Sequence, residues 1–361
     1  MKEKIESLWA KNKGHVLIAG PCSAETEEQL MASVKAIAAE GIKVARAGVW
    51  KPRTRPNTFE GIGVPALEWI QNIKKEIDIQ FAIEVATAQH VELALKHDID
   101  VLWIGARTTV NPFTVQEIAD ALKGVDIPIL IKNPINPDLA LWIGAFERIA
   151  NSGITKLGAI HRGFSSHRKT KYRNEPLWHI PIDLKRTFPD IPMIGDPSHI
   201  GGTRDLIESI SQKALDLNYD GLMIEVHPDP DKAWSDAKQQ ITPARLKELL
   251  EVLQIRSATS DNVLFISKLE QLRNKIDESD HELIDVIRNR MDIVEEIGLY
   301  KKENNVAILQ LDRWNEIIKS RGMWGKEVNL NSEFIEDIYK LIHAESIKKQ
   351  TTISNGHKLS E

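Results

Sequence analysis

Cysteine is almost absent from this chain, which has a single one, Cys22, among 361 residues. One cysteine cannot form an internal disulfide, as is typical of proteins in a reducing compartment. Apolar runs long enough to span a bilayer are absent, and the N-terminal stretch MKEKIESLWAKNKGH lacks the apolar core of a signal peptide. These absences predict a cytoplasmic protein that does not enter a membrane.

An excess of positive charge is also missing. The net charge of −5 gives no electrostatic reason to expect binding to nucleic acid or to an anionic membrane. Hydrophobic residues, in contrast, make up 42% of the chain, which is enough for a sizeable core in one domain or two.

Short β-rich runs alternate with amphipathic helical segments through the first two thirds of the chain. Near-continuous apolar strands between helices are typical of a parallel sheet with both faces covered. Eight such units in about 250 residues predict a closed (β/α)8 (TIM) barrel, in the α/β class. A doubly wound open sheet is the alternative, but no G-x-G-x-x-G motif comes after the first run. The runs are 15–20, 42–47, 81–85, 101–105, 128–132, 156–160, 192–195 and 221–226.

The pattern changes after residue 254. We predict a barrel domain over 1–254, a polar linker over 255–262, an all-helical domain over 263–350 and a disordered tail over 351–361. Leucine, isoleucine, methionine and valine step by three, four or seven residues along the first helical segment, which we place at 263–304. Two more helical segments are expected at about 307–320 and 331–350.

Polar side chains lie where a barrel carries its chemistry, just past the C-terminal ends of the predicted strands. A thiol, an imidazole and two carboxylates among them suit a divalent transition ion: Cys22, His199, Glu225 and Asp236. No two of these are sequence neighbours, and a lone cysteine is more often a small buried side chain. His161 and His227 are rival ligands that spacing does not exclude.

Basic residues also collect at the strand ends. Any one of them could simply extend into solvent, but together they predict a site for anions, because arginine binds phosphate and carboxylate in a bidentate manner. Six cations suggest two phosphorylated ligands, and hence an enzyme that joins or cleaves phosphorylated metabolites. They are Arg46, Lys51, Arg53, Arg107, Lys132 and Arg162.

The segments GPCS, KPRTRPNTFEG, IGARTT, IGDPSHIGG and GLMIEVHPDPDKAWSDAKQQ resemble the type Iβ family of 3-deoxy-arabino-heptulosonate 7-phosphate (DAHP) synthases, in order, along residues 13–252. The resemblance implies condensation of phosphoenolpyruvate with erythrose 4-phosphate, with a divalent metal, expected to be manganese, on Cys22, His199, Glu225 and Asp236. Its closest rival is octulosonate phosphate synthase, whose acceptor segment reads K-A-N-R-S and which often has Asn in place of the cysteine.

The same resemblance implies roles for further residues. Lys132 and His199 are the expected acid/base groups. The phosphoenolpyruvate site is expected to use Arg46, Arg107, Lys132 and Arg162. The aldose phosphate would lie on Lys51, Pro52, Arg53 and Thr54, in a pocket lined by Glu84 and Ala106.

Basic residues on the first C-terminal helix differ in whether one small ligand could join them. Arg273 and Arg290 would lie about 25 Å apart, too far for one ligand within one chain. Arg290 and Lys301 would lie about 16 Å apart on one face, a gap that their long side chains can close around a small dianion. Pairing of the helix with a copy of itself would bring Arg273 of one chain to Arg290 and Lys301 of another. A solvated helix face is the alternative.

Residues 265–350 resemble the all-helical class of chorismate mutases, through LEQLRNKIDESDHELIDVIRNRMDIVEEIGLYKKE, LDRW and LIHAESIKKQ. The resemblance implies rearrangement of chorismate to prephenate, with Lys301 and Gln350 at the breaking ether bond and Arg273, Arg290 and Arg313 on the carboxylates. Gln310 and Trp314 stand where acids often occur. We therefore predict a bifunctional enzyme, a homodimer or larger homo-oligomer through these helices, inhibited by prephenate or chorismate bound there. The alternative is a helical domain that only regulates or dimerises.

Overall fold

The computed structural model describes residues 16–52, 58–166, 170–257 and 259–355. The chain divides into two compact units between residues 258 and 259. This point lies inside the segment predicted as a linker, whose described residues form neither helix nor strand.

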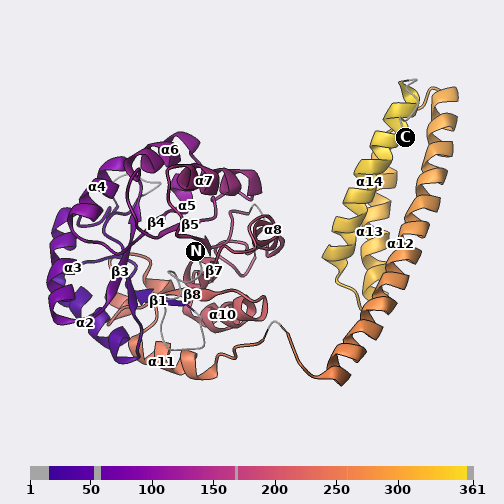
Figure 1. Cartoon of the computed structure of the whole chain (residues 1–361). Helices are drawn as coiled ribbons and strands as arrows, with labels where there is room; N and C mark the ends of the chain where they lie inside the picture. Colours follow the sequence, from indigo (N-terminus) through magenta and orange to yellow (C-terminus); the bar gives the residue numbers. More distant parts are fainter. Residues whose placement is uncertain (1–15, 53–57, 167–169, 258, 356–361) are drawn as a thin grey trace. The chain divides into compact units, whose positions relative to one another are not determined.

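The first unit is a closed barrel of parallel strands in the order β1 to β8, which confirms the predicted fold (Figure 1). Each strand is short, and its residues are almost all buried, because the strands face helices on one side and the barrel interior on the other. The strands are β1 (Val16–Gly20), β2 (Val44–Ala47), β3 (Gln80–Val85), β4 (Val101–Ile104), β5 (Ile129–Lys132), β6 (Leu157–His161), β7 (Met193–Gly195) and β8 (Gly221–Glu225).

Helices surround the strands, and many begin at a side-chain cap. Thr26, Thr87, Asn111 and Asp138 each accept a hydrogen bond from a backbone N–H of the first turn, which fixes where the helix starts. The helices are α2 (Glu27–Ala39), α3 (Val64–Glu76), α4 (Ala88–Lys96), α5 (Ala106–Thr109), α6 (Pro112–Ala121), α7 (Leu139–Asn151), α8 (His179–Thr187), α9 (Pro197–Gly201), α10 (Ile207–Asp216) and α11 (Pro243–Val252).

Two separate apolar cores stabilise the barrel. The larger lies between the strands and the helices. The smaller fills the barrel interior, where Trp103 of β4 is its bulkiest member, with Ile18, Leu130 and Met223 around it. Because the interior is filled with side chains, the strand ends form a floor on which a polar site can be built.

The second unit is three helices: α12 (Val263–Glu303), α13 (Leu311–Glu327) and α14 (Ser332–Ser354). Helix α14 packs against both α12 and α13. Glycine allows close contact at two points, since a Cβ on Gly298 would lie 3.0 Å from Ile353 Cδ1 and one on Gly325 would lie 2.6 Å from Ile335 Cγ1. Helix α12 begins at Val263 as predicted.

Three predicted helix ends in this domain need correction. Helix α13 continues to Glu327, seven residues past its expected end near 320. Helix α13 starts at Leu311, four residues after the expected start, since Gln310 has an extended backbone and is its N-cap. Helix α14 continues to Ser354, so residues 351–354 are helical rather than disordered. Packing explains the extension: Lys302 Nζ of α12 donates a hydrogen bond to the carbonyl of Ile353 at 2.8 Å. Residues 356–361 lie outside the described residues.

Candidate active sites

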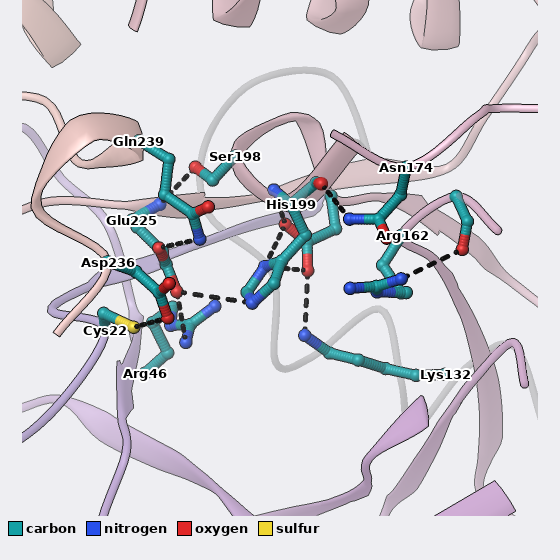
Figure 2. Close-up of polar contacts among 12 residues, drawn as sticks. Cys22, Arg46, Lys132, Arg162, Asn174, Ser198, His199, Glu225, Asp236 and Gln239 are labelled. Carbon is teal, nitrogen blue, oxygen red and sulfur yellow. Dashed lines mark hydrogen bonds and ion pairs between the residues drawn. The ribbon is translucent and has the colours of Figure 1, made fainter. Parts of the chain in front are cut away.

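The C-terminal ends of the strands bring polar residues together at one end of the barrel (Figure 2). Lys132 and Glu225 are the last residues of β5 and β8. Cys22 comes just after β1, which pairs with β8 so that Gly20 lies opposite Glu225. Gly20 has φ of 141°, and a Cβ there would lie 2.3 Å from the carbonyl oxygen of Arg46, so only glycine fits.

Cys22 is fully buried beside groups of both charges. Its thiol lies 3.4 Å from Asp236 Oδ2, and Lys51 Nζ is 2.6 Å from Sγ. Its backbone N–H donates to Gln240 Oε1 at 2.9 Å, which holds the β1 loop against the loop after β8. Burial, together with the charge of Glu225, raises the pKa of Cys22 to about 12. A divalent ion bound beside Sγ would favour the thiolate over the thiol.

His199 belongs to a hydrogen-bonded set centred on Asp196. The Asp196 carboxylate, which is completely buried, accepts from His199 Nδ1 at 2.9 Å and from Lys132 Nζ at 2.8 Å. The hydrogen bond to Nδ1 leaves the Nε2 lone pair of the neutral ring facing Glu225, whose Oε1 is 3.7 Å away. Burial and the nearby Lys132 lower the pKa of His199, which favours the neutral ring.

Arg46 and Glu225 form the most deeply buried ion pair of the site, with Nη2 3.0 Å from Oε1. Arg46 also lies over the Trp103 ring, its Cζ 5.2 Å from the centroid. Glu225 Oε2 accepts a hydrogen bond from Gln239 Nε2 at 2.7 Å. Burial opposes ionisation of Glu225, but His199, Arg46 and Lys51 outweigh it and lower its pKa.

The four predicted metal ligands thus stand as two neighbouring pairs, Cys22 with Asp236 and His199 with Glu225. As they stand, no three Cys, His, Asp or Glu side chains of the described residues have the spacing for one ion. The donor chemistry nevertheless fits a divalent transition ion. Glu225 Oε1 is buried, and its ion pair with Arg46 lacks the geometry of a hydrogen bond, so this oxygen keeps a lone pair for a metal ion.

Both rival histidines are engaged elsewhere. His161 Nε2 lies 2.6 Å from the carbonyl of Pro176 and its Nδ1 lies 3.0 Å from the Tyr219 hydroxyl. His227 Nδ1 accepts from the backbone N–H of Asp229 at 3.0 Å, and its Nε2 faces Glu25 at 3.4 Å. These contacts occupy both ring nitrogens of His161 and the Nδ1 of His227.

The cations differ in how the barrel holds them. Arg46, Lys132 and Arg162 are buried, whereas Arg107, in the short helix α5, is exposed. Burial, together with Arg107 and Arg173, lowers the pKa of Arg162 to about 10. The lowered pKa reflects repulsion between neighbouring positive charges, and an anion bound among them would relieve that repulsion.

The acceptor segment is only partly described. Lys51 and Pro52 are half-buried at the barrel mouth, and Arg53 and Thr54 lie outside the described residues. Glu84 accepts a hydrogen bond from Trp103 Nε1 at 3.0 Å, next to Ala106 at the start of α5. A Cβ on Gly105 would lie 2.0 Å from Glu84 Oε1, so this carboxylate is fixed against the β4 loop.

Sequence reasoning missed three residues that support this site: Asp196, Arg173 and Gln239. Asp196 resembles an ordinary helix cap, and it does cap α9 through the backbone N–H of His199. Arg173 donates to Asp236 Oδ1 at 2.9 Å and to Gln239 Oε1 at 2.6 Å. The carboxylate of Asp196, three residues before His199, was the one available signal, because imidazole ligands commonly carry such a partner.

The helical unit has its own cavity of about 770 Å³ between its three helices. Four of the five residues predicted to bind chorismate line it: Arg290, Lys301, Arg313 and Gln350. Gln310 and Trp314, the two unusual positions, line it as well, and the Trp314 ring stacks on His343 with centroids 3.9 Å apart. Arg273 is exposed on the first half of α12, where it pairs with Glu270 at 2.6 Å.

Polar atoms in this cavity have capacity for a ligand. Gln350 Oε1 is buried and accepts no hydrogen bond from the described residues. Arg290 donates to Ser346 Oγ at 2.9 Å, and Lys301 Nζ donates to the carbonyl of Ile308 at 2.6 Å. Partial burial lowers the pKa of Lys301. The cavity is therefore cationic, with an amide directed into it.

A (β/α)8 barrel with cations and metal-type donors at its strand ends is typical of enzymes that act on phosphorylated metabolites. Comparison with known families identifies which one. Residues 3–260 match the DAHP synthetase I family, more than half of the chain, and the chain belongs to that family. Residues 272–351 match the chorismate mutase type II family, so the chain joins domains of two enzyme families.

Individual relatives are consistent with this. The phospho-2-dehydro-3-deoxyheptonate aldolase of Thermotoga maritima is 32% identical over 66% of this chain and 68% of that protein. Its crystal structure superposes with a TM-score of 0.60 at 31% identity, covering 67% of this chain and 68% of that one. The 2-dehydro-3-deoxyphosphooctonate aldolase of Cupriavidus necator is 28% identical over 67% of this chain and 89% of that protein.

No helix formed by the described residues is both long and apolar enough to cross a membrane.

Proposed function

We propose that the barrel condenses phosphoenolpyruvate with erythrose 4-phosphate to DAHP and that the helical domain converts chorismate to prephenate. Family membership supports the two activities. For the barrel, the observation that carries the proposal is the convergence of Arg46, Lys132 and Arg162 with Cys22 and its neighbouring donors at the strand ends.

A divalent ion is part of the barrel proposal. Cys22, His199, Glu225 and Asp236 would hold it, and Lys51 and Arg46, which now lie against Sγ and Glu225 Oε1, would move aside. The mixed donor set suits a divalent transition ion, and we propose manganese from the resemblance to the DAHP synthases. When bound, the ion would polarise the aldehyde carbonyl of the acceptor.

The side chains of the protein would bind the substrates and transfer the proton. Arg162, Arg107 and Lys132 would hold the phosphate and carboxylate of phosphoenolpyruvate, and Lys51 the acceptor phosphate. C3 of phosphoenolpyruvate forms the new carbon–carbon bond to the aldehyde carbon, and the aldehyde oxygen gains a proton from Lys132. Water then adds at C2 and returns one proton to Lys132. The C2 hydroxyl gives its proton to the departing phosphate as the C2–O bond to phosphate breaks, which leaves the C2 keto group. Asp196 Oδ2, 2.8 Å from Lys132 Nζ, keeps the lysine in place for this step.

The rate of phosphoenolpyruvate consumption with each acceptor sugar distinguishes the heptulosonate activity from the octulosonate activity. We expect phosphoenolpyruvate to be consumed rapidly with erythrose 4-phosphate and not with arabinose 5-phosphate, because the KPRT segment and Cys22 resemble the heptulosonate enzymes. Turnover with arabinose 5-phosphate alone would move the barrel to the octulosonate activity. Turnover with neither would refute the barrel proposal.

For the helical domain, the cavity of about 770 Å³ with Arg290, Lys301 and Gln350 carries the proposal. Rearrangement of chorismate needs no nucleophile, so catalysis means holding a compact conformer and stabilising negative charge on the ether oxygen. Lys301 and Gln350 would face that oxygen, and Arg290, Arg313 and Arg273 of the partner subunit would bind the carboxylates. The side-chain carbonyl of Gln310 would accept a hydrogen bond from the ring hydroxyl, in place of an acidic side chain. Loss of chorismate absorbance measures this activity directly.

We also propose a homodimer or larger homo-oligomer through these helices. The first half of α12 is exposed and carries apolar side chains that are roughly half accessible, such as Leu272 (46%), Ile276 (59%) and Leu283 (58%). Covering them with a second copy would bring Arg273 to the partner's cavity. Sedimentation of the full chain should give a dimer or larger, and a monomer at micromolar concentration would refute this.

Feedback inhibition is the last part of the proposal. We expect prephenate or chorismate to bind the helical domain and slow condensation by the barrel. We also propose that the protein works in the reducing cytoplasm, which suits a chain with a single cysteine. Truncation near residue 255 should abolish the inhibition while condensation persists. Full inhibition of the truncated chain would contradict the proposal. The alternative, a helical domain without catalysis, is supported by Gln310 and Trp314, and chorismate turnover by the full chain would exclude it.

A further inference from the structure

Two rings outside the proposed ligand contacts join the β2 and β3 loops. Trp50 lies in the loop after β2, directly before Lys51, and His90 lies in the first turn of α4. Their rings are stacked, with centroids 4.0 Å apart and planes only 5° from parallel. Neither residue belongs to the metal-type donors or to the cations assigned to substrate.

Each ring is held independently of the other. His90 Nδ1 accepts a hydrogen bond from the backbone N–H of Ala86 at 3.3 Å, and the backbone N–H of His90 donates to the Thr87 cap at 3.2 Å. Gly63, the residue before α3, lies near the indole edge, since a Cβ there would be 3.6 Å from Nε1. The indole therefore lies close to the starts of both α3 and α4.

The loop that begins at Trp50 is closed by hydrogen bonds between its two stems. The Lys51 N–H donates to the carbonyl of Glu60 at 2.8 Å, and the Gly63 N–H donates to the carbonyl of Val49 at 3.1 Å. The second stem has a ring contact of its own, because Phe59 lies edge-on to Trp234 with centroids 5.4 Å apart. Lys51 Nζ reaches Cys22 from this loop, so the anchoring of Trp50 bears directly on where Lys51 lies.

We infer that the Trp50–His90 stack positions Lys51 and Pro52 for the phosphate of the acceptor sugar, without either ring touching the substrate. This inference rests on the proposed condensation and names two positioning residues for it. The cations that would hold phosphoenolpyruvate lie on β2 and β5 and after β4 and β6, outside the loop that begins at Trp50. Loss of the stack should therefore weaken binding of the acceptor sugar and leave binding of phosphoenolpyruvate unchanged.

The test compares His90→Ala with His90→Phe in the full chain. We expect His90→Ala to raise the KM for erythrose 4-phosphate about 3- to 10-fold, the loss that corresponds to one aromatic pair. The KM for phosphoenolpyruvate and the rate of chorismate turnover should not change. His90→Phe keeps the ring face and should restore the KM for the acceptor.

The matched control is His97→Ala at the other end of the same helix, where Nδ1 contacts the carbonyl of Leu93 at 2.7 Å. It should alter neither KM. If it raises the acceptor KM as His90→Ala does, the effect belongs to the stability of α4 and the inference is wrong. If His90→Ala does not fold, Trp50→Phe and Trp50→Leu make the same comparison from the other ring, with the larger rise expected for leucine.

Two further results would overturn the inference: equal changes in both KM values for His90→Ala, or no recovery in His90→Phe. A wild-type chain that fails to consume phosphoenolpyruvate with erythrose 4-phosphate would refute the proposed function, and the inference with it. An active wild type matched by His90→Ala would refute the inference alone.

Discussion

Asp196 is the buried carboxylate on which the barrel site most depends, and Asp196→Asn tests that dependence. The substitution keeps the shape of the side chain and removes its charge. The ammonium of Lys132, 4% exposed, then loses the carboxylate 2.8 Å away but keeps its contact with the face of Trp103, whose centroid is 5.5 Å from Nζ. His199 and Lys132 hold the pKa of Asp196 well below its usual range against the effect of burial, so the carboxylate is charged at pH 7.

Breaking one partner out of a buried ion pair costs about 3–5 kcal/mol. We expect the lower end, about 3 kcal/mol, because the amide oxygen can still accept from His199. For a barrel of this size, that loss lowers the unfolding temperature by about 6–12 °C. Condensation should slow by at least about 100-fold, because Lys132 loses the group that positions it as a proton donor.

Calorimetry of the full chain measures the shift, and chorismate turnover by the same sample is an internal control that should not change. Asp183→Asn is the matched control, since its carboxylate is 41% exposed and pairs with Arg186 one turn along α8. It should change stability by less than about 0.5 kcal/mol. Wild-type condensation and an unshifted barrel transition in Asp196→Asn would refute the reasoning.

Three further predictions concern both domains. Gly105→Ala should slow condensation and lower the unfolding temperature of the barrel, because its Cβ would lie 2.0 Å from Glu84 Oε1; steady-state rates at the wild-type level would contradict this. Gln350→Ala should lower chorismate turnover about 100-fold or more while condensation continues at the wild-type rate, because one donor to the developing oxyanion is lost. Burial lowers the pKa of Lys301, and the protonated amine is the donor, so chorismate turnover should decline as pH rises through a value below 10.5. Lys301→Arg should remove this decline. A pH profile that is unchanged in Lys301→Arg would refute the assignment.

Local patterns were enough to predict the barrel. Each strand is a short buried run of apolar residues, such as Ile129–Lys132, and several helices between strands begin at a capping side chain. The helical domain was harder at its ends. The stretch before Leu311 looks helical by composition, but Gln310 adopts an extended backbone, and the last turn of α14 depends on contacts with α12 that no local pattern reveals.

The sequence was enough to predict which residue types form the site, but not all of the contacts between their side chains. The barrel topology brings Cys22 and Asp236 together although they are far apart in sequence, and motif resemblance identified both. The Lys51 ammonium against the Cys22 thiol could not be foreseen, because it depends on the path of the loop after β2. The metal-ligand roles stay predictions until an ion is measured.

The measurement that tests the central claim most directly is the rate of phosphoenolpyruvate consumption with erythrose 4-phosphate, before chelation, after chelation and after manganese is restored. We predict loss of condensation on chelation and its return with manganese, while chorismate turnover by the same sample continues throughout. Condensation that persists without metal would contradict the role given to Cys22, His199, Glu225 and Asp236.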